Sequence, residues 1–331
     1  MTTPAVEDKK LMAPRRLTQL LDEGSLKYIT AQQDGLGAIS VSGTINGREV
    51  IAFANDPSFQ GGALGGAEGS VITDAYAIAM DKQCPIIGVW HSGGARLQEG
   101  IQSLKAFGEI FRAMTHASGK IPQVSVVLGP AAGGGAYGPA LTDIVILGPE
   151  GRVFVTGPDV VRSVTGEDVD MLRLGGPEPH GRRSGVVHVV SETEDQALAD
   201  TRYIADLMGR QQSFDQDSVK DIDLAQFLPE SAVRAYDVHP IVDAVIDEGS
   251  GIELHPRWAP NLVTTLGRFG GRTVGVVANN PLRLGGCLDA TSAEKGARFV
   301  RMCDALGIPL IVMVDVPGYL PGVGQEWDGV V

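Results

Sequence analysis

The sequence predicts an α/β fold built from two copies of one unit. Short apolar runs rich in β-branched residues alternate with amphipathic helical patterns, which is typical of βαβ units. A glycine-rich segment over residues 129–140 lies between two of the predicted strands. Part of the first half also recurs, without a gap, in the second half. Together these three observations predict tandem α/β domains, the first of which contains a glycine-rich loop with an accessible backbone.

Length and composition narrow the class of protein. At 331 residues the chain exceeds the usual size of a single domain. Its 27 basic and 40 acidic residues give a net charge of −13, which argues against a nucleic-acid surface. The three cysteines show no C-x-x-C spacing, so we expect free thiols in a reducing compartment. No apolar run is long enough to span a membrane, and residues 1–10 are polar. We therefore expect a soluble, cytoplasmic protein with no nucleic-acid or membrane partner.

The alternation of predicted strands and helices is clearest in the first half of the chain. Strands over 38–42 and 49–54 flank Asn46-Gly47, the dipeptide that a type I′ hairpin turn prefers. The glycine loop 61–66 precedes one helical pattern, and the segment 91–100 precedes another. The apolar faces of these two helices consist of Val71, Ile72, Ala75, Tyr76 and Ala79, and of Ile101, Leu104, Phe107, Phe111 and Met114. Further strands are predicted over 85–90, 124–128, 141–147 and 152–158.

Three consecutive glycines, Gly133, Gly134 and Gly135, remove every Cβ from one short arc of backbone between predicted strands. Such an arc can approach a ligand closely and aim its N–H groups at one point. Donors held in this way stabilise an oxyanion, because their dipoles are in place before the charge develops. The alternative is a tight turn whose glycines only permit a positive φ. The loop by itself does not decide between the two interpretations.

A dinucleotide-binding interpretation of the same loop is weak. Gly133, Gly135 and Gly138 match G-x-G-x-x-G, but Pro139 follows at once and disfavours helix at Gly138. No Lys-Ser or Lys-Thr pair closes the loop, so the segment is not a P-loop. An oxidoreductase that binds a dinucleotide remains an outside alternative.

The internal repeat has a constant offset. Residues 47–64 align without a gap to 271–288, an offset of 271 − 47 = 224, and nine of the 18 aligned positions are identical. The same offset carries Pro85 onto Pro309 and Ile87 onto Ile311. The counterparts of Gly133 and Gly134 would fall at positions 357 and 358, after Val331. We therefore expect an incomplete second copy and a C-terminally truncated sequence, with a domain boundary in the polar stretch 213–240.

Several sequence blocks resemble the carboxyltransferase β subunits of biotin-dependent acyl-CoA carboxylases, most of all the actinobacterial acetyl/propionyl-CoA carboxylase β chains. The blocks are 61–63, 91–100, 132–134 with Tyr137 and Pro139, 154–159, Gly185, 279–281, 285–288, 295–300 and 315–319. The resemblance runs from about residue 12 to the end. It implies tandem crotonase-like (ClpP/enoyl-CoA hydratase) domains: an N-terminal carboxyltransferase domain over 12–226 and the start of a C-terminal one over 234–331.

The resemblance also implies a mechanism. Carboxybiotin on a separate carrier protein releases CO2 beside the α-carbon of an acyl-CoA. The biotin ureido group then takes the α-proton, and the resulting enolate attacks the CO2. Two backbone oxyanion holes stabilise the charges; the first maps onto Gly133 and Gly134, and the second would lie after Val331. Such chemistry needs no side-chain base or nucleophile, and the sequence contains no G-x-S-x-G or H-E-x-x-H motif. Neither a biotinyl Met-Lys-Met site nor a zinc-ribbon cysteine before Cys84 is present, so we expect no attached biotin and no metal.

The CoA-binding residues that the resemblance implies are Gly62, Ala63, Gly93, Gly94, Ala95, Arg96 and Tyr137. A guanidinium at Arg96 would suit the phosphates of CoA. The alternative, an ordinary cap or salt bridge, is slightly favoured for an arginine in this position. Gly93 and Gly94 stand where a helix N-terminus is expected, a good place for an anion. His91, at a strand end, is expected to make only structural hydrogen bonds.

The leading hypothesis is therefore a carboxyltransferase subunit that moves a carboxyl group from carboxybiotin to acetyl-CoA or propionyl-CoA, in fatty-acid metabolism. The resemblance implies a biotin carboxylase/carrier α subunit as partner and a homo-oligomer, a hexamer in the full-length family. Alternatives are a biotin-dependent decarboxylase or transcarboxylase subunit, or an inactive CoA-binding fragment. The position that selects the acyl-CoA is expected after Val331, and the 331 residues alone are not expected to transfer carboxyl groups.

Overall fold

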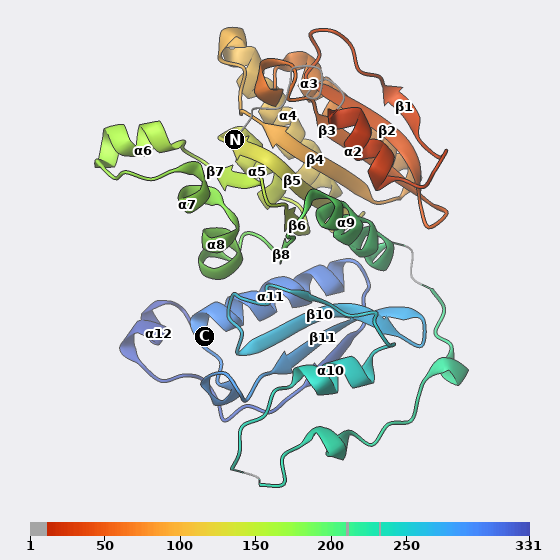
Figure 1. Cartoon of the computed structure of the whole chain (residues 1–331), viewed down its shortest axis with the longest axis vertical. Helices are drawn as coiled ribbons and strands as arrows, with labels where there is room; N and C mark the ends of the chain where they lie inside the picture. The colour runs from red at the N-terminus through yellow and green to blue at the C-terminus, as the bar shows by residue number, and fades with distance from the viewer. Residues whose placement is uncertain (1–11, 210–211, 232) are drawn as a thin grey trace. The chain divides into compact units, whose positions relative to one another are not determined.

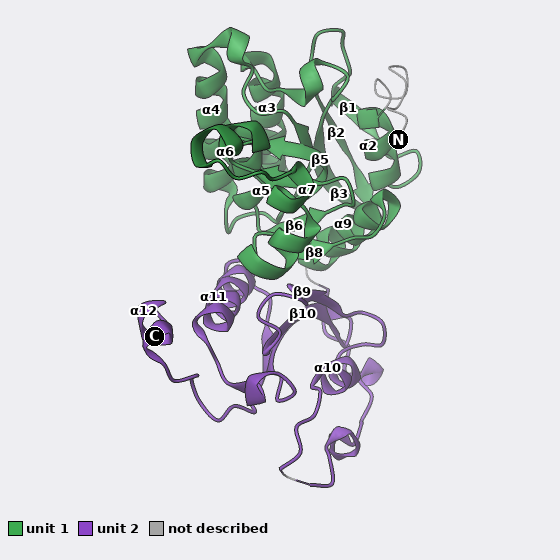
Figure 2. Cartoon of the chain, turned by 60° about the vertical axis from the view of Figure 1, so that its left-hand side comes forward, with its two compact units in different colours: residues 1–209 green, residues 210–331 purple. Residues whose placement is uncertain are grey.

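The chain forms two compact units in the computed structural model, residues 1–209 and residues 210–331 (Figure 2). The structure describes residues 12–209, 212–231 and 233–331, so the predicted polar lead over 1–10 lies outside the described residues. Phe214 stacks on Phe269 at 5.7 Å between ring centroids, and the N–H of Asp215 donates to the Gly270 carbonyl at 2.9 Å. The division into units therefore falls before the predicted domain boundary between residues 226 and 234.

The first unit is built on an eight-stranded sheet of order β1-β2-β3-β4-β5-β6-β8, with β7 paired to β5 (Figure 1). Its strands are β1 (Lys27–Thr30), β2 (Ala38–Ile45), β3 (Arg48–Asn55), β4 (Ile86–Ser92), β5 (Gln123–Ala132), β6 (Ile144–Leu147), β7 (Arg152–Phe154) and β8 (Val189–Val190). β2 and β3 form the predicted antiparallel hairpin, and Asn46 and Gly47 both take the positive φ of a type I′ turn. From β3 onward the strands run parallel.

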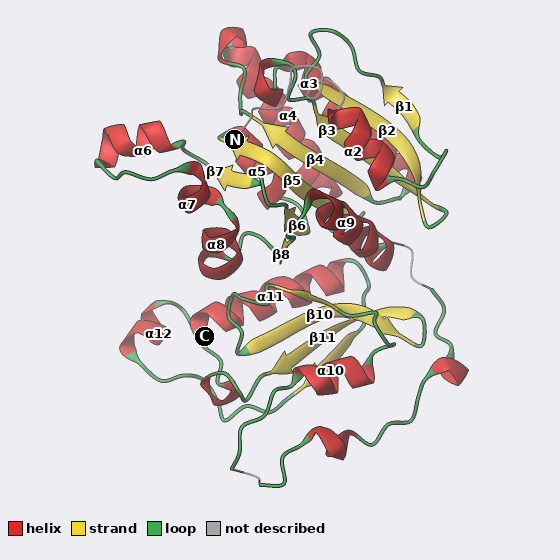
Figure 3. Cartoon of the chain, viewed as in Figure 1, coloured by secondary structure: helices red, strands yellow, loops and turns green. Residues whose placement is uncertain are grey.

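Helices cover both faces of this sheet (Figures 2 and 3). They are α2 (Met12–Leu20), η1 (Gln60–Gly62), α3 (Gly66–Lys82), η2 (Leu97–Glu99), α4 (Ile101–Ala117), α5 (Gly134–Ala140), α6 (Pro158–Thr165), α7 (Met171–Gly175), α8 (Pro177–Pro179), the π-helix η3 (His180–Ser184) and α9 (Glu194–Met208). The predicted apolar face of α3 is buried throughout. On α4, Phe107 and Met114 are buried, whereas Ile101 and Leu104 are 77% and 66% exposed, so the predicted apolar face is covered only in part. The polar, glycine-rich residues 163–185 contain the end of α6 and the whole of α7, α8 and η3.

The second unit contains a four-stranded sheet of order β12-β11-β10-β9. Its elements are η4 (Gln216–Ser218), η5 (Leu224–Phe227), α10 (His239–Val245), β9 (Ile252–Leu254), β10 (Leu262–Phe269), β11 (Arg272–Asn279), η6 (Leu284–Gly286), α11 (Ala290–Ala305), β12 (Leu310–Met313) and α12 (Val323–Trp327). A small apolar core joins α10 to the sheet through Val242, Ile246, Val263, Val274 and Val276.

The predicted repeat is confirmed in three dimensions. Shifted by 224 residues, the bounds of β2, β3 and η1 become those of β10, β11 and η6. The isolated bridge between Leu64 and Ala95 becomes the one between Leu288 and Tyr319. The turn glycine of η1, with φ of 74°, becomes its counterpart in η6, with φ of 78°. The two units are therefore built on one α/β framework.

Candidate functional site

Three loops of the first unit meet where parallel strands β3, β4 and β5 end, the edge of an α/β sheet at which ligands bind. Their residues are 61–64, 92–96 and 132–135. The N–H of Gly93 donates to the Gly61 carbonyl at 3.1 Å, and the N–H of Leu64 donates to the Gly94 carbonyl at 2.8 Å. The N–H of Arg96 donates to the Leu64 carbonyl at 2.8 Å. This ladder brings together all the predicted CoA-binding residues except Tyr137.

Close backbone contacts explain the glycines in these loops. At Gly62, where φ is 74°, an added Cβ would lie 2.0 Å from the His91 carbonyl oxygen. At Gly94, where φ is 94°, it would lie 2.9 Å from the Ala132 carbonyl oxygen. Only glycine, which has no Cβ, can adopt such a positive φ with a carbonyl oxygen this close to the place where a Cβ would stand. The second loop is therefore packed directly on the backbone that leads into Gly133.

The glycine arc, which we define as Gly133 to Gly135, forms the start of α5. Gly133 is the N-cap residue, with φ of 54° and ψ of −125°, and its own N–H donates to the Phe154 carbonyl at 3.1 Å. Gly134 and Gly135 are the first two helical residues, and the N–H groups of a first helical turn have no acceptor within the helix. Of the predicted pair, Gly134 therefore presents a donor, whereas Gly133 shapes the turn that aims it.

The other two members of the arc are enclosed by side chains. A Cβ on Gly134 would lie 2.7 Å from the Phe107 ring, and one on Gly135 would lie 3.1 Å from the Cβ of Ser92. α5 continues through Gly138 and Pro139 to Ala140, so the expectation that Pro139 would keep Gly138 out of a helix was wrong. In so short a helix the proline removes at most one intrahelical hydrogen bond.

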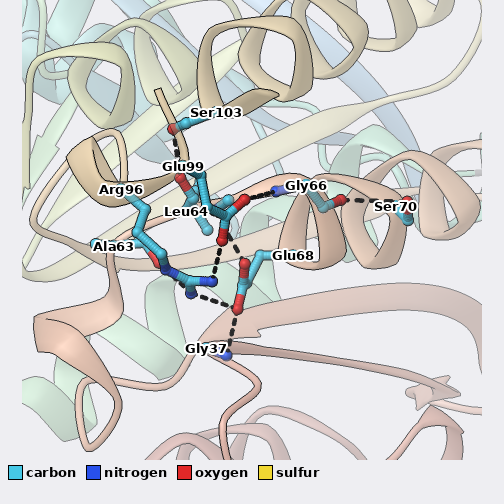
Figure 4. A network of polar contacts seen from close by, with 10 residues as sticks. Gly37, Ala63, Leu64, Gly66, Glu68, Ser70, Arg96, Glu99 and Ser103 are labelled. Carbon is cyan, nitrogen blue, oxygen red and sulfur yellow. Dashed lines mark hydrogen bonds and ion pairs between the residues drawn. The ribbon is translucent and has the colours of Figure 1, made fainter. Parts of the chain in front are cut away.

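Arg96 lies inside the first unit, in a network of ion pairs and hydrogen bonds (Figure 4). Its guanidinium donates to the carboxylate of Glu68 at 2.5 Å, to that of Glu99 at 2.6 Å and to the Ala63 carbonyl at 3.1 Å. It also stacks over the Phe59 ring, 4.8 Å from the centroid, and the residue is only 8% exposed. This is the salt-bridge alternative that the sequence left open, and it leaves the guanidinium committed to partners within the unit.

The remaining predicted residues have simpler surroundings. The N–H of His91 donates to Oδ1 of Asn55 at 3.3 Å, and its Nδ1 lies 3.4 Å from the guanidinium of Arg16, which fits the expected structural role. Tyr137, on α5, is about half exposed and sets its ring edge-on to Phe111. Among the described residues there is no group of three or more His, Cys, Asp or Glu side chains that could hold a metal ion.

Sequence reasoning missed the two carboxylates that bind Arg96. Glu68 stands three residues after the N-cap Gly65, which is the capping-box spacing, and its carboxylate accepts the Gly65 N–H at 2.9 Å. Glu99 stands three residues after Arg96, a spacing at which helical side chains meet. Both signals were present in the sequence. The wider partner set, which includes the N–H of Gly37, depends on the tertiary fold.

Exposed apolar side chains gather at the start of α4 and on the segment after β7. Leu97, Ile101 and Leu104 precede the buried part of α4, and Val155 and Val160 follow β7. No helix among the described residues, taken alone, is both long and apolar enough to cross a lipid bilayer.

Comparison with known proteins gives consistent matches. The model of the carboxyl transferase domain family matches residues 9–331. The chain is 56% identical over 319 residues to the biotin-dependent acetyl-/propionyl-coenzyme A carboxylase beta6 subunit of Mycobacterium tuberculosis, covering 96% of this chain and 67% of that protein. It is 53% identical over 338 residues to a propionyl-CoA carboxylase beta chain of Rhodococcus erythropolis, covering 99% and 71%.

The fold matches as well. The structure of the transcarboxylase 12S hexamer with methylmalonyl-coenzyme A bound has a TM-score of 0.91 and 35% sequence identity, covering 98% of this chain and 70% of that one. None of these matches favours the dinucleotide-binding alternative for the glycine arc.

Proposed function

Because this chain belongs to the carboxyl transferase domain family, we propose that it is the carboxyltransferase subunit of a biotin-dependent acyl-CoA carboxylase. Its reaction is transfer of a carboxyl group from carboxybiotin to the α-carbon of a short acyl-CoA, acetyl-CoA or propionyl-CoA. The observation that carries the proposal is the glycine arc at the start of α5, supported by packed loops at the carboxyl ends of three strands. The fold is the tandem crotonase-like α/β fold of the family.

The glycine arc acts on the thioester oxygen of the acyl-CoA. The α-proton would pass to the ureido group of biotin once CO2 has been released from carboxybiotin. Negative charge then moves from the α-carbon to the thioester oxygen, which the N–H groups of Gly134 and Gly135 face. Gly133 keeps these peptides oriented through its hydrogen bond to Phe154. Fixed donors of this kind lower the barrier because they need no reorganisation when the charge forms. The resulting enolate then takes up the carboxyl group at its α-carbon.

Biotin supplies the activated carboxyl group, and we propose that it arrives on a separate carrier protein. The resemblance assigns biotin to the second unit. One observation there fits this assignment: a Cβ on Gly286 would lie 2.5 Å from the Asp315 carbonyl oxygen. This loop therefore has the close-packed form of its counterpart at Gly62. The residues of this chain would hold and orient the group without being attached to it.

The proposal includes partners. We infer a homo-oligomer, because Leu97, Ile101, Leu104 and Val160 leave apolar surface uncovered beside the site. The related 12S transcarboxylase is a hexamer. The second partner is an α subunit with biotin carboxylase and carrier domains, and the complex is placed in the cytoplasm, where acyl-CoA substrates occur. The predicted CoA contacts of Gly62, Ala63, Gly93 to Ala95 and Tyr137 remain part of the proposal.

A second candidate function is transcarboxylation between two acyl compounds, and it is favoured by the likeness to the 12S transcarboxylase. Both candidates share the half-reaction at the glycine arc and differ in where the carboxyl group comes from. The test is carboxyl transfer from methylmalonyl-CoA or malonyl-CoA to free biotin, followed by release of propionyl-CoA or acetyl-CoA, with the protein in its native assembly. Biotin-dependent product formation is expected from an assembly that includes the second oxyanion hole, which the sequence predicts after Val331, and none above background from that assembly would refute both candidates. Purifying the assembly and identifying the protein that carries its biotin separates them.

A further inference from the structure

Glu68 is the centre of the network in Figure 4, and it is fully buried. One carboxylate oxygen accepts the N–H of Gly37 at 2.8 Å and the guanidinium of Arg96 at 2.5 Å. The other oxygen accepts the N–H of Gly65 at 2.9 Å. A single side chain on α3 therefore connects the loop before β2, the start of its own helix and the loop that follows β4.

The network continues from Arg96 to the glycine arc. Arg96 binds Glu99, whose second carboxylate oxygen accepts the N–H of Gly66 at 2.8 Å. Arg96 also holds the Ala63 carbonyl, and its backbone belongs to the ladder that positions Gly94. Gly94 in turn packs against the Ala132 carbonyl, the peptide that leads into Gly133. Glu68 is thus connected to the glycine arc by consecutive contacts but does not reach the substrate position itself.

The second unit provides an internal comparison. With the offset of 224, Ser292 stands at the position of Glu68, Leu320 at that of Arg96 and Val323 at that of Glu99. Two of the three ladder hydrogen bonds form there: the N–H of Leu288 donates to the Gly318 carbonyl at 3.1 Å, and the N–H of Leu320 donates to the Leu288 carbonyl at 2.7 Å. The framework therefore closes these loops without any of the three charges.

The charges are also costly to bury. The Nε atom of Arg96 is buried and finds no hydrogen-bond acceptor among the described residues. Burial opposes the charge of Arg96, but the ion pairs with Glu68 and Glu99 outweigh it and raise the pKa of the guanidinium. Buried ion pairs of this kind contribute little net stability compared with apolar side chains of similar volume. The second unit closes its equivalent loops with one carboxylate, that of Asp289, which accepts the N–H of Ser292 at 2.9 Å and an amide N–H of Asn261 at 3.2 Å, and with no buried ion pair among the residues described at these positions.

We propose that Glu68, together with Arg96 and Glu99, is a positioning residue of the carboxyltransferase reaction, which fixes the loops that support the glycine arc. The inference rests on the proposed function. The ion pairs hold the N–H donors of the glycine arc in the geometry that the transition state needs, because donors misplaced by about 1 Å can cost on the order of a hundredfold in rate. The loops that carry the proposed CoA contacts keep their ladder of backbone hydrogen bonds when the charges are removed, so KM should change less than kcat.

The test replaces the three charged residues by their counterparts in the second unit. The triple variant Glu68→Ser/Arg96→Leu/Glu99→Val and the single variant Glu68→Gln are assayed for carboxyl transfer from methylmalonyl-CoA to biotin in the native assembly. Glu109→Gln is the control, because it removes a carboxylate from an exposed ion pair with Lys105 on α4. We expect both network variants to fold, to lose roughly ten- to a hundredfold in kcat, and to keep KM for the acyl-CoA within about threefold.

Each other outcome has one meaning. A folded triple variant with kcat within about twofold of the wild-type value would overturn the inference, and so would failure of the triple variant to fold, since the charges would then be a requirement of the fold. Restored kcat in Glu68→Asp, but not in Glu68→Gln, would support the charged contact. If the wild type and Glu109→Gln are themselves inactive, the proposed function fails, and the inference fails with it.

Discussion

Gly133→Ala tests whether the glycine arc acts through its backbone conformation. Gly133 has φ of 54° and ψ of −125°, which alanine adopts only with strain of about 1–3 kcal/mol. Space is not the obstacle, because the nearest atom to an added Cβ is the Val155 carbonyl oxygen at 3.9 Å. The strain is relieved if the peptide between Gly133 and Gly134 rotates. That rotation turns the N–H of Gly134 away from the thioester oxygen.

The chain offers a matched control in Gly100→Ala. Gly100 has the same φ of 54° and ψ of −125° and is also an N-cap residue, but it caps α4. An added Cβ there would meet nothing within 4 Å. The two variants should therefore lose similar amounts of stability for the same conformational reason. Only Gly133→Ala removes a donor from the glycine arc, which costs about a hundred- to a thousandfold in kcat, or roughly 2.7–4 kcal/mol.

The assay measures the melting temperature and the carboxyl-transfer kcat of both variants beside the wild type. We expect equal losses of melting temperature and a kcat for Gly133→Ala that is at least about thirtyfold below that of Gly100→Ala. Gly134→Val is a poorer test, because its side chain would collide with Phe107 whether or not the N–H is catalytic. Equal kcat values in the two alanine variants would refute the assignment of the arc to the oxyanion.

Three further predictions concern stability and titration. Burial raises the pKa of Asp143 from 3.8 to about 6, so ionisation of this carboxyl lowers the stability of the fold as the pH rises through this range. The variant Asp143→Asn should therefore be more stable than the wild type by up to about 3 kcal/mol at pH 8, and by less at pH 5. Equal gains at the two pH values in urea unfolding would contradict this prediction. Hydrogen bonding to Glu253 is the largest cause that raises the pKa of His239 to about 9. The stabilisation is complete below pH 6.5 and lost as the pH rises through 9, so a wild-type NMR titration midpoint near 6.5 would show the contact to be absent. Gly62→Ala and Gly286→Ala should each cost about 2 kcal/mol or more, because each Cβ meets a carbonyl oxygen at equivalent positions of the repeat, and a neutral effect at either position would exclude that close approach in solution.

Much of the framework could be predicted from sequence because it depends on local patterns. The Asn46-Gly47 hairpin and the apolar face of α3 follow from turn chemistry and periodicity. The repeat was visible because its offset stays constant over both blocks. The exposure of Ile101 and Leu104 could not be predicted, because helical periodicity shows an apolar face without showing whether anything covers it.

The sequence predicted the glycine loop but not how its N–H groups are used within the fold. The sequence placed Gly133 and Gly134 in one loop, but which N–H is used internally depends on the carbonyl of Phe154, a residue of another strand. Arg96 raised the same difficulty, because a guanidinium suits a phosphate and a carboxylate equally well. Its choice of Glu68 is decided by the packing of α3 against the loop after β4, and spacing along the chain does not encode that contact.

The central claim is that the acyl-CoA thioester is activated at the glycine arc of the first unit. The most direct measurement is an experimental structure of the native assembly with propionyl-CoA bound. The thioester oxygen should lie about 2.7–3.1 Å from the backbone nitrogen of Gly134, the range for a working oxyanion donor. A fully occupied thioester whose oxygen faces any other part of the protein, with Gly134 remote from it, would contradict the claim.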